Sequence, residues 1–162
     1  MDEPAGEVFS FITDLLRPVG GYLYGRRMYE TMAVWETDPT LATQSELMAD
    51  FANVWQMADK IVYSSTLPAV PTAKTQLERR FDPDAVRDMK MSTVGDFTVG
   101  GPTLTAHALR AGLVDECHLI VYPLLVGRGK PAFPSDFPAE LELLTERRFD
   151  SGVVYLRYRI QN

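Results

Sequence analysis

The sequence contains one cysteine and two histidines among its 162 residues. A single cysteine excludes a disulfide within the chain, and so few sulfur and imidazole ligands leave little for a zinc centre. Cys117 and His118 are neighbours on a predicted strand, so their side chains point to opposite faces and do not form a nucleophile–base pair. Cys117 is expected to be a small buried hydrophobic residue.

Basic residues are also scarce, because 16 lysines and arginines stand against 22 acidic residues and give a formal net charge of -6. A chain this acidic is not expected to bind nucleic acid or a membrane surface. No apolar run approaches the roughly 20 residues of a membrane helix. Residues 1–4 carry no basic segment of the kind that opens a signal peptide. We therefore expect a soluble cytoplasmic protein.

The length and composition are those of one globular domain. About 150 residues is typical of a domain, and 46% of the residues are hydrophobic while 23% are charged. Prolines and glycines are spread along the chain without a low-complexity linker or a repeat, so residues 1–162 are interpreted as a single domain.

Hydrophobic periodicity predicts helices that alternate with strands. Asp82-Pro83-Asp84 is a typical helix start and Ser45 a plausible N-cap, while Asp150-Ser151-Gly152 is typical of a hairpin turn. Helices are expected at 5–17, 27–34, 44–58, 82–91 and 102–111, and strands at 22–24, 60–64, 75–81, 97–99, 117–126 and twice within 141–160. This order predicts an α/β fold, a doubly wound and mostly parallel sheet with an antiparallel C-terminal hairpin.

Ligands of open α/β sheets bind beyond the carboxyl ends of the strands, so the turns at those ends are the candidate sites. The first turn is Gly25-Arg26-Arg27-Met28, where a glycine turns the chain into a helix whose free N–H groups and two arginines suit a phosphate. The alternative interpretation is a glycine turn with two surface arginines.

The second turn, Ser64-Ser65-Thr66, follows a buried strand and offers three hydroxyl groups. These hydroxyls are able to hydrogen-bond a phosphate, although such residues more commonly cap a loop or a helix.

The third turn is Gly100-Gly101-Pro102-Thr103-Leu104. Paired glycines permit close approach of a ligand to the backbone, and Pro102 sets the start of a helix whose first N–H groups face an anion. The pattern is not the dinucleotide fingerprint of ordinary Rossmann domains, and a tight strand–helix turn is the alternative. Together, the three turns are expected to converge along one rim of the sheet. The basic loop 127–130 either approaches a ligand phosphate or is a plain solvent loop.

In this order, the turns resemble those of the dihydrofolate reductase-like superfamily, with the reductase domain of the bacterial riboflavin-biosynthesis deaminase-reductase as the closer match. The resemblance covers nearly the whole chain. It rests on residues 25–30, on Trp55 with residues 58–67, on residues 99–104, and on residues 112–116 leading into 118–127 and Gly129.

The resemblance implies a sheet that binds NADPH and an enzyme that reduces a pyrimidine-like or pteridine-like heterocycle, as a 5-amino-6-(5-phosphoribosylamino)uracil reductase does. Carried over to this sequence, Arg26 and Ser64 contact the 2′-phosphate, with Arg27, Met28 and Ser65 near it, while the Gly-Gly turn packs under the pyrophosphate. The implied cofactor-binding set is Gly25, Arg26, Arg27, Met28, Ser64, Ser65, Thr66, Gly100, Gly101, Pro102, Thr103 and Leu104.

The sequence departs from this family at its start. Members usually open on an apolar strand that lies centrally in the sheet, whereas this chain opens on the helix at 5–17. Three interpretations are open: the strand was lost, this gene product starts late, or the strands near 97–99 and 118–126 close the gap. The acidic residue that dihydrofolate reductases place on their first helix has no counterpart, because Phe9 falls there and Glu7 is only near it. Folate is therefore not the expected substrate.

The cofactor of such an enzyme carries the hydride, so no catalytic triad is expected and the proton donor remains unnamed. The alternative function is a nucleotide-binding or regulatory module that has the same fold without catalysis. A homodimer is expected from the family and from the apolar run 119–126 beside a hairpin rich in valine and tyrosine.

Overall fold

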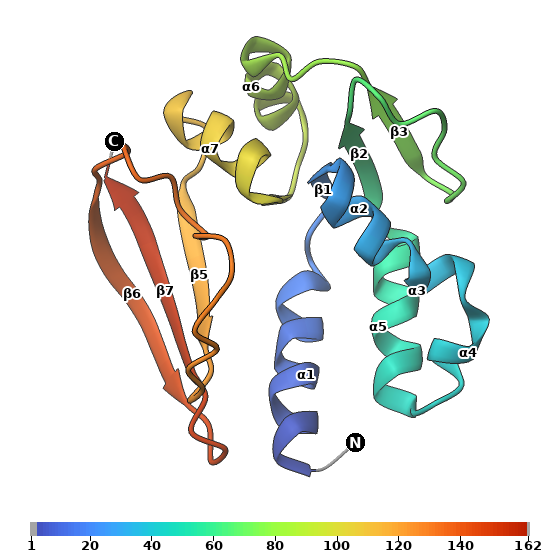
Figure 1. The fold of residues 1–162 in the computed structure, drawn as a ribbon, viewed down its shortest axis with the longest axis vertical. Helices are drawn as coiled ribbons and strands as arrows, with labels where there is room; N and C mark the ends of the chain where they lie inside the picture. The colour runs from blue at the N-terminus through green and yellow to red at the C-terminus, as the bar shows by residue number, and fades with distance from the viewer. Residues whose placement is uncertain (1–2, 162) are drawn as a thin grey trace.

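The computed structural model describes residues 3–161 (Figure 1). Its helices are α1 (Glu3–Leu16), α2 (Arg26–Met32), α3 (Val34–Thr37), α4 (Pro39–Ala42), α5 (Glu46–Met57), α6 (Pro83–Ser92) and α7 (Pro102–Arg110). Its strands are β1 (Gly21–Gly25), β2 (Asp59–Tyr63), β3 (Thr75–Glu78), β4 (Phe97–Gly100), β5 (Glu116–Val121), β6 (Glu140–Arg148) and β7 (Val154–Gln161). None of the helices over residues 3–161 is both long and apolar enough to cross a membrane.

The strands form two sheets, and the predicted α/β class is confirmed. Sheet A is parallel, in the order β3-β2-β1-β4, and sheet B is antiparallel, in the order β5-β7-β6. The expected single sheet is thus divided, because within the described residues β4 pairs with β1 alone and β5 with β7 alone. The strands near 97–99 and 118–126 do not close the gap, and no strand precedes α1 within residues 3–161.

Two helices begin at the N-cap residues that the sequence predicts. The Ser45 hydroxyl accepts a hydrogen bond from the Met48 amide at 3.1 Å, and the Asp82 carboxylate accepts from the Asp84 amide at 3.0 Å. A serine or aspartate cap of this kind contributes about 1 kcal/mol. These caps fix the starts of α5 and α6, which cover opposite faces of sheet A.

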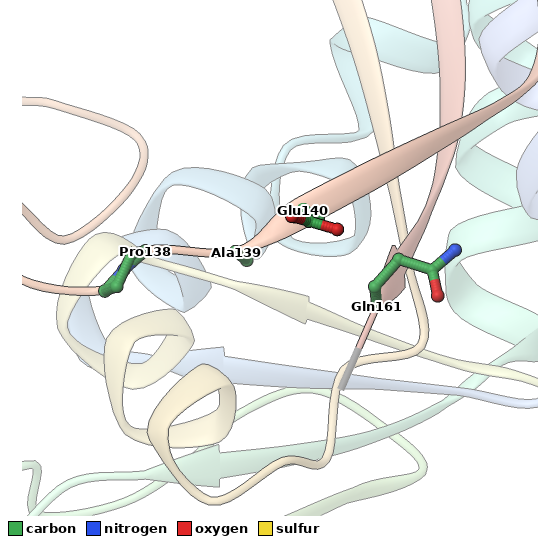
Figure 2. A pocket seen from close by; sticks show the side chains of 4 residues that line it. All are labelled: Pro138, Ala139, Glu140 and Gln161. Atoms are coloured by element: carbon green, nitrogen blue, oxygen red, sulfur yellow. The ribbon is translucent and has the colours of Figure 1, made fainter.

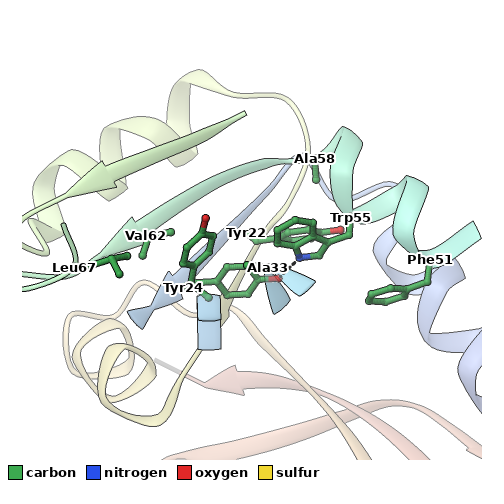
Figure 3. Packing of buried hydrophobic residues seen from close by; sticks show 9 residues of the cluster. Tyr22, Tyr24, Ala33, Phe51, Trp55, Ala58, Val62 and Leu67 are labelled. Atoms are coloured by element: carbon green, nitrogen blue, oxygen red, sulfur yellow. Dashed lines mark hydrogen bonds between the residues drawn. The ribbon is translucent and has the colours of Figure 1, made fainter. Parts of the chain in front are cut away.

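Sheet A is packed on both faces, as the doubly wound prediction requires. On one face, Tyr22, Tyr24 and Val62 pack against Trp55 and Phe51 of α5, and the Trp55 indole donates a hydrogen bond to the Tyr24 hydroxyl at 3.1 Å (Figure 3). On the other face, Leu23 packs with Val86, Leu104, Ala108 and Leu113. Residues 22–24 therefore alternate between two cores, which is why a strand so short is almost completely buried.

A third core joins helix α1 to sheet B. Val8 of α1 is buried together with Phe149, Val153 and Tyr155. The Phe11 ring packs edge-on against the Tyr155 ring, with 4.7 Å between the ring centroids. The other side of α1 contacts α5 through Phe9 and Phe51, whose ring centroids are 5.4 Å apart. Helix α1 accordingly lies between sheet B and α5 (Figure 1).

The apolar run after Cys117 is the least accurate part of the prediction. Strand β5 ends at Val121, whereas a strand to Val126 was expected. Pro123 has no N–H group for a ladder, and the Leu124 amide instead donates to the Tyr122 carbonyl at 2.8 Å, which turns the chain. Residues 122–126 are consequently exposed outside either sheet.

Candidate functional site

The carboxyl ends of β1, β2 and β4 lie side by side. Strand β1 is flanked by β2 and β4, and the register pairs Gly25 with Tyr63 and Tyr24 with Gly100. The three predicted turns follow directly from these paired residues. The expectation that they meet along one rim of the sheet is therefore confirmed.

A side-chain contact links the first turn to the second. The Arg26 guanidinium donates from Nη1 to the Thr66 hydroxyl at 2.8 Å and from Nε to the Glu30 carboxylate at 2.8 Å. Arg26 has five N–H donors, so the remaining three, including both on Nη2, are free for an anion. The Arg26 and Glu30 side chains are 43% and 49% exposed, so the ion pair aligns the guanidinium without removing it from solvent.

The second turn is held by the hydroxyl group of Ser64. Ser64 is only 9% exposed, and its Oγ accepts hydrogen bonds from the amides of Thr66 and Leu67 at 3.3 and 3.0 Å. Arg79 clamps the same turn by donating to the carbonyls of Ser64 and Leu67 at 3.3 and 2.6 Å. Ser64 thus shapes the turn, and the hydroxyls that face solvent are those of Ser65 and Thr66.

The third turn approaches the first through backbone alone. Gly101 has φ +102°, a conformation that side-chain-bearing residues rarely adopt, and a Cβ there would lie 3.6 Å from the Gly25 nitrogen. A Cβ on Gly100 would lie 3.1 Å from Cγ of Met28, so this position is filled already. Glycine therefore suits the two positions for different reasons: a Cβ on Gly100 would crowd Met28 and Tyr24, whereas Gly101 is favoured by its positive φ.

The helices that begin at this rim have no side-chain caps. Gly25 precedes α2 and Gly101 precedes α7, and neither helix has an acidic residue in its first turn. Pro102 has no N–H group, so the first N–H groups of α7 are those of Thr103 and Leu104; they lack a side-chain capping acceptor, and Thr103 is exposed. Free N–H groups and exposed arginines at one rim favour a ligand with several phosphate groups.

Other candidate residues lie away from this rim. Glu7 pairs with Arg147 of β6 at 3.1 Å, so it does not face the three turns. His118 lies within sheet B, where its Nδ1 is 2.7 Å from the Tyr155 hydroxyl. Cys117 is partly buried, which raises the pKa of its thiol. The basic loop 127–130 is exposed along its whole length. No cluster of metal-ligating residues is present among the described residues.

Two residues of the site were not singled out from the sequence. Glu30 lies four residues after Arg26 on α2, and this spacing alone predicts the ion pair that forms. Arg79 lies in the segment 75–81 that was expected to be a strand, but β3 ends at Glu78, so Arg79 lies beyond the strand and reaches the second turn. Only the three-dimensional position of that turn reveals this contact.

Surface hollows lie elsewhere on the molecule. One is lined by Pro138, Ala139, Glu140 and Gln161, where β6 begins and β7 ends (Figure 2). A second lies at the amino end of sheet A, and its lining includes Asp59 and Lys74. Neither hollow includes a residue of the three turns.

Comparisons with known proteins agree with this arrangement. The sequence profile of the RibD C-terminal domain matches residues 22–155. An uncharacterized protein of Bacillus subtilis, YyaP, is 27% identical over 153 residues, which cover 90% of this chain and 77% of that protein.

Two solved structures share the fold. One is a putative riboflavin biosynthesis protein from Shewanella (TM-score 0.70, 18% identity, 92% of this chain and 78% of that chain). The other is a pyrimidine reductase-like protein from Corynebacterium diphtheriae (TM-score 0.58, 14% identity, 100% of this chain and 83% of that chain).

Proposed function

Because the chain belongs to the RibD C-terminal domain family, we propose that it is an NADPH-dependent reductase that transfers a hydride to a pyrimidine-like or pteridine-like heterocycle. The observation that carries the proposal is the meeting of three strand-end turns at one rim, joined by the Arg26–Thr66 hydrogen bond of 2.8 Å. A dinucleotide phosphate needs several anion-binding points in a row, and this rim supplies them.

The residues present fit such a cofactor. Arg26, already aligned by Glu30, binds the 2′-phosphate together with Arg27 and the exposed hydroxyls of Ser65 and Thr66. Ser64 holds the turn that presents them. Gly100 and Gly101 leave the third turn free of side chains. The N–H groups of Thr103 and Leu104 therefore reach a pyrophosphate there.

The reduced nicotinamide supplies the hydride when it is bound, and the protein supplies position and exclusion of water. Such a reaction needs no catalytic cysteine or histidine, and none of the described cysteine and histidine residues lies in the three turns. We assign no proton donor, because Glu30, the carboxylate beside the first turn, is engaged by Arg26. Cytoplasmic localisation is part of the same proposal, since a reductase of this kind works where NADPH is abundant.

A second function, a nucleotide-binding or regulatory module without catalysis, is favoured by one observation. Strands β4 and β5 lie in different sheets, so the sheet is interrupted beside the third turn. A substrate that binds next to the nicotinamide on a continuous sheet would not find that surface here. Phosphate binding at the turns, in contrast, needs only β1, β2 and β4.

Thermal shift with NADPH, with NADH and without ligand tests both functions. A rise in melting temperature with NADPH that exceeds the rise with NADH is expected. No shift at millimolar NADPH overturns both. NADPH oxidation, followed by absorbance with a panel of pyrimidines and pterins, then separates them: turnover supports the reductase, and binding without turnover supports the module.

A further inference from the structure

An acidic side chain lies beside the arginines of the first turn. Glu30 follows Arg26 by one turn of α2, and its Oε1 accepts a hydrogen bond from Nε of Arg26 at 2.8 Å. Tyr29, next to Glu30, is only 2% exposed, and its hydroxyl is 2.8 Å from Oγ1 of Thr72. This burial fixes the rotation of α2 about its own axis, so Glu30 is held at the rim together with Arg26.

The carboxylate of Glu30 has acceptor capacity that the ion pair does not use. A carboxylate offers about four lone-pair sites on its two oxygens. Within residues 3–161, the side chain of Glu30 accepts a hydrogen bond from Arg26 alone, through Oε1. Oε2 is consequently free to accept a hydrogen bond from a ligand, since the Glu30 side chain is 49% exposed. Arg26 and Glu30 thus present N–H donors and a carboxylate acceptor next to each other.

The charge of Glu30 also changes how strongly the first turn attracts a phosphate. Arg27 is exposed and forms no ion pair with a described residue, so Arg26, Arg27 and Glu30 together carry one net positive charge. A phosphate monoester carries about -1.5 to -2 charges near neutral pH. A dinucleotide with a 2′-phosphate therefore meets a repulsive carboxylate directly beside the arginine that binds it. A dinucleotide without that phosphate does not meet this repulsion.

The 2′-hydroxyl of NADH has the opposite requirement, because it donates a hydrogen bond. Dinucleotide sites commonly use an acidic side chain for the ribose 2′-hydroxyl of NAD and an arginine for the 2′-phosphate of NADP. The first turn holds both groups 2.8 Å apart. We propose that Glu30 is the specificity-determining residue of the rim: its free carboxylate oxygen accepts the 2′-hydroxyl of NADH, and its charge limits the preference for NADPH. This inference rests on the proposed function and adds that NADH is also bound.

The first experiment removes the charge of Glu30 and keeps its shape. Glu30→Gln retains an acceptor oxygen for Nε of Arg26, and the Kd values for NADPH and NADH are measured by titration calorimetry. Loss of the repulsion should tighten NADPH binding and loss of the acceptor should weaken NADH binding, so the ratio of Kd for NADH to Kd for NADPH should rise about tenfold. A ratio equal to that of the wild type overturns the inference.

Glu142→Gln is the matched control. Glu142 lies on β6 in sheet B, forms an ion pair with Arg159 at 2.9 Å and is 49% exposed, as Glu30 is. This variant removes the same charge from the chain at a distance from the three turns. The ratio of the two Kd values should stay at the wild-type value, and a rise equal to that of Glu30→Gln overturns the inference.

The second experiment separates the charge of Glu30 from its geometry. Glu30→Asp keeps the charge on a side chain one methylene shorter, and its ratio of Kd values should be closer to the wild-type ratio than to that of Glu30→Gln. The difference between wild type and Glu30→Gln should also shrink as the Debye length falls from about 30 Å at 0.01 M salt to about 3 Å at 1 M. An aspartate variant that behaves like the glutamine variant, or a difference that salt does not change, overturns the inference.

Failure of this inference and failure of the proposed function are distinguishable. A wild-type chain that binds neither dinucleotide at millimolar concentration overturns both. A wild-type chain that binds NADPH, with a ratio of Kd values that does not depend on the charge at position 30, overturns the inference alone. Circular dichroism of each variant excludes unfolding as the cause of a change in Kd.

Discussion

The guanidinium of Arg26, directly after β1, donates a hydrogen bond to the hydroxyl of Thr66, three residues after the end of β2. The two residues are 40 positions apart in the chain and 2.8 Å apart in space. This contact presents a cation and a hydroxyl together before any ligand arrives, which lowers the ordering cost of binding an anion there.

Arg26→Ala should weaken NADPH binding at least tenfold and leave NADH binding nearly unchanged. The physical reason is the loss of charge-assisted hydrogen bonds to the 2′-phosphate, worth about 1.5–3 kcal/mol. Titration calorimetry with both dinucleotides measures the two constants. Arg87→Ala, in the remote helix α6 with an exposed ion pair to Asp84, serves as the control. Equal losses for NADPH and NADH would contradict the assignment of Arg26 to the 2′-phosphate.

Gly101→Ala should reduce dinucleotide binding strongly. A Cβ at φ +102° strains the backbone by about 1–3 kcal/mol, and relief of this strain displaces the turn from which α7 begins. Gly129→Ala is the matched control, because Gly129 has φ +130° but no atom within 4 Å of its Cβ position. The Kd for NADPH should rise only for the Gly101 variant. A similar Kd for both variants would show that the third turn does not contact the ligand.

Lys60→Met should destabilise the fold by about 1–3 kcal/mol. Lys60 is 1% exposed, and its Nζ donates to the carbonyls of Trp55 and Ala58 at 2.9 and 2.8 Å, so it closes the end of α5. Desolvation by burial lowers the pKa of this ammonium group, yet removal of the group orphans two carbonyl oxygens. Urea unfolding measures the difference. Lys74→Met, at an exposed lysine bonded to the Met57 carbonyl, should cost less than about 0.5 kcal/mol.

Glu116→Gln should destabilise the chain by about 1 kcal/mol near neutral pH and have no effect in acid. Hydrogen bonds from Arg157, both 2.8 Å, hold the pKa of the Glu116 carboxyl below its ordinary value of 4.5. A lowered pKa stabilises the folded state above pH 4.5, and this contribution disappears as the pH falls through the folded-state pKa.

The measurement is urea unfolding of the wild-type and Glu116→Gln chains from pH 7 down to about 3. Glu140→Gln on β6 is the control, because Glu140 is exposed and has no ion-pair partner among the described residues. A difference between wild type and Glu116→Gln that persists unchanged into acid would show that the ion pair is not its source.

Local sequence signals predicted most of the elements. Ser45 and Asp82 cap helices where residue type and spacing indicated, since capping depends on neighbours two or three residues away. The hairpin around residues 150–152 forms for the same reason. The meeting of the strand ends at Gly25 and Gly100 was expected because the ligand-binding turns of open α/β sheets follow the carboxyl ends of the strands.

Long-range packing accounts for what the sequence did not predict. Lys60 is buried because the end of α5 lies beside the start of β2, and no local pattern reveals a lysine that closes a helix from a following strand. Arg79 reaches the carbonyls of a turn 12 and 15 residues earlier. The division of the sheet between β4 and β5 depends on which edges find partners, and periodicity carries no information about this.

The separation of β4 from β5 also determines where the molecule exchanges its amide hydrogens. A strand with one unpaired edge has backbone groups on that side without a strand partner. Within the described residues no ladder of hydrogen bonds joins the two sheets, and α1 connects them through side-chain packing against the cores of both. Deuterium should therefore enter β4 and β5 sooner than β1, whose amides are enclosed by strands on both sides.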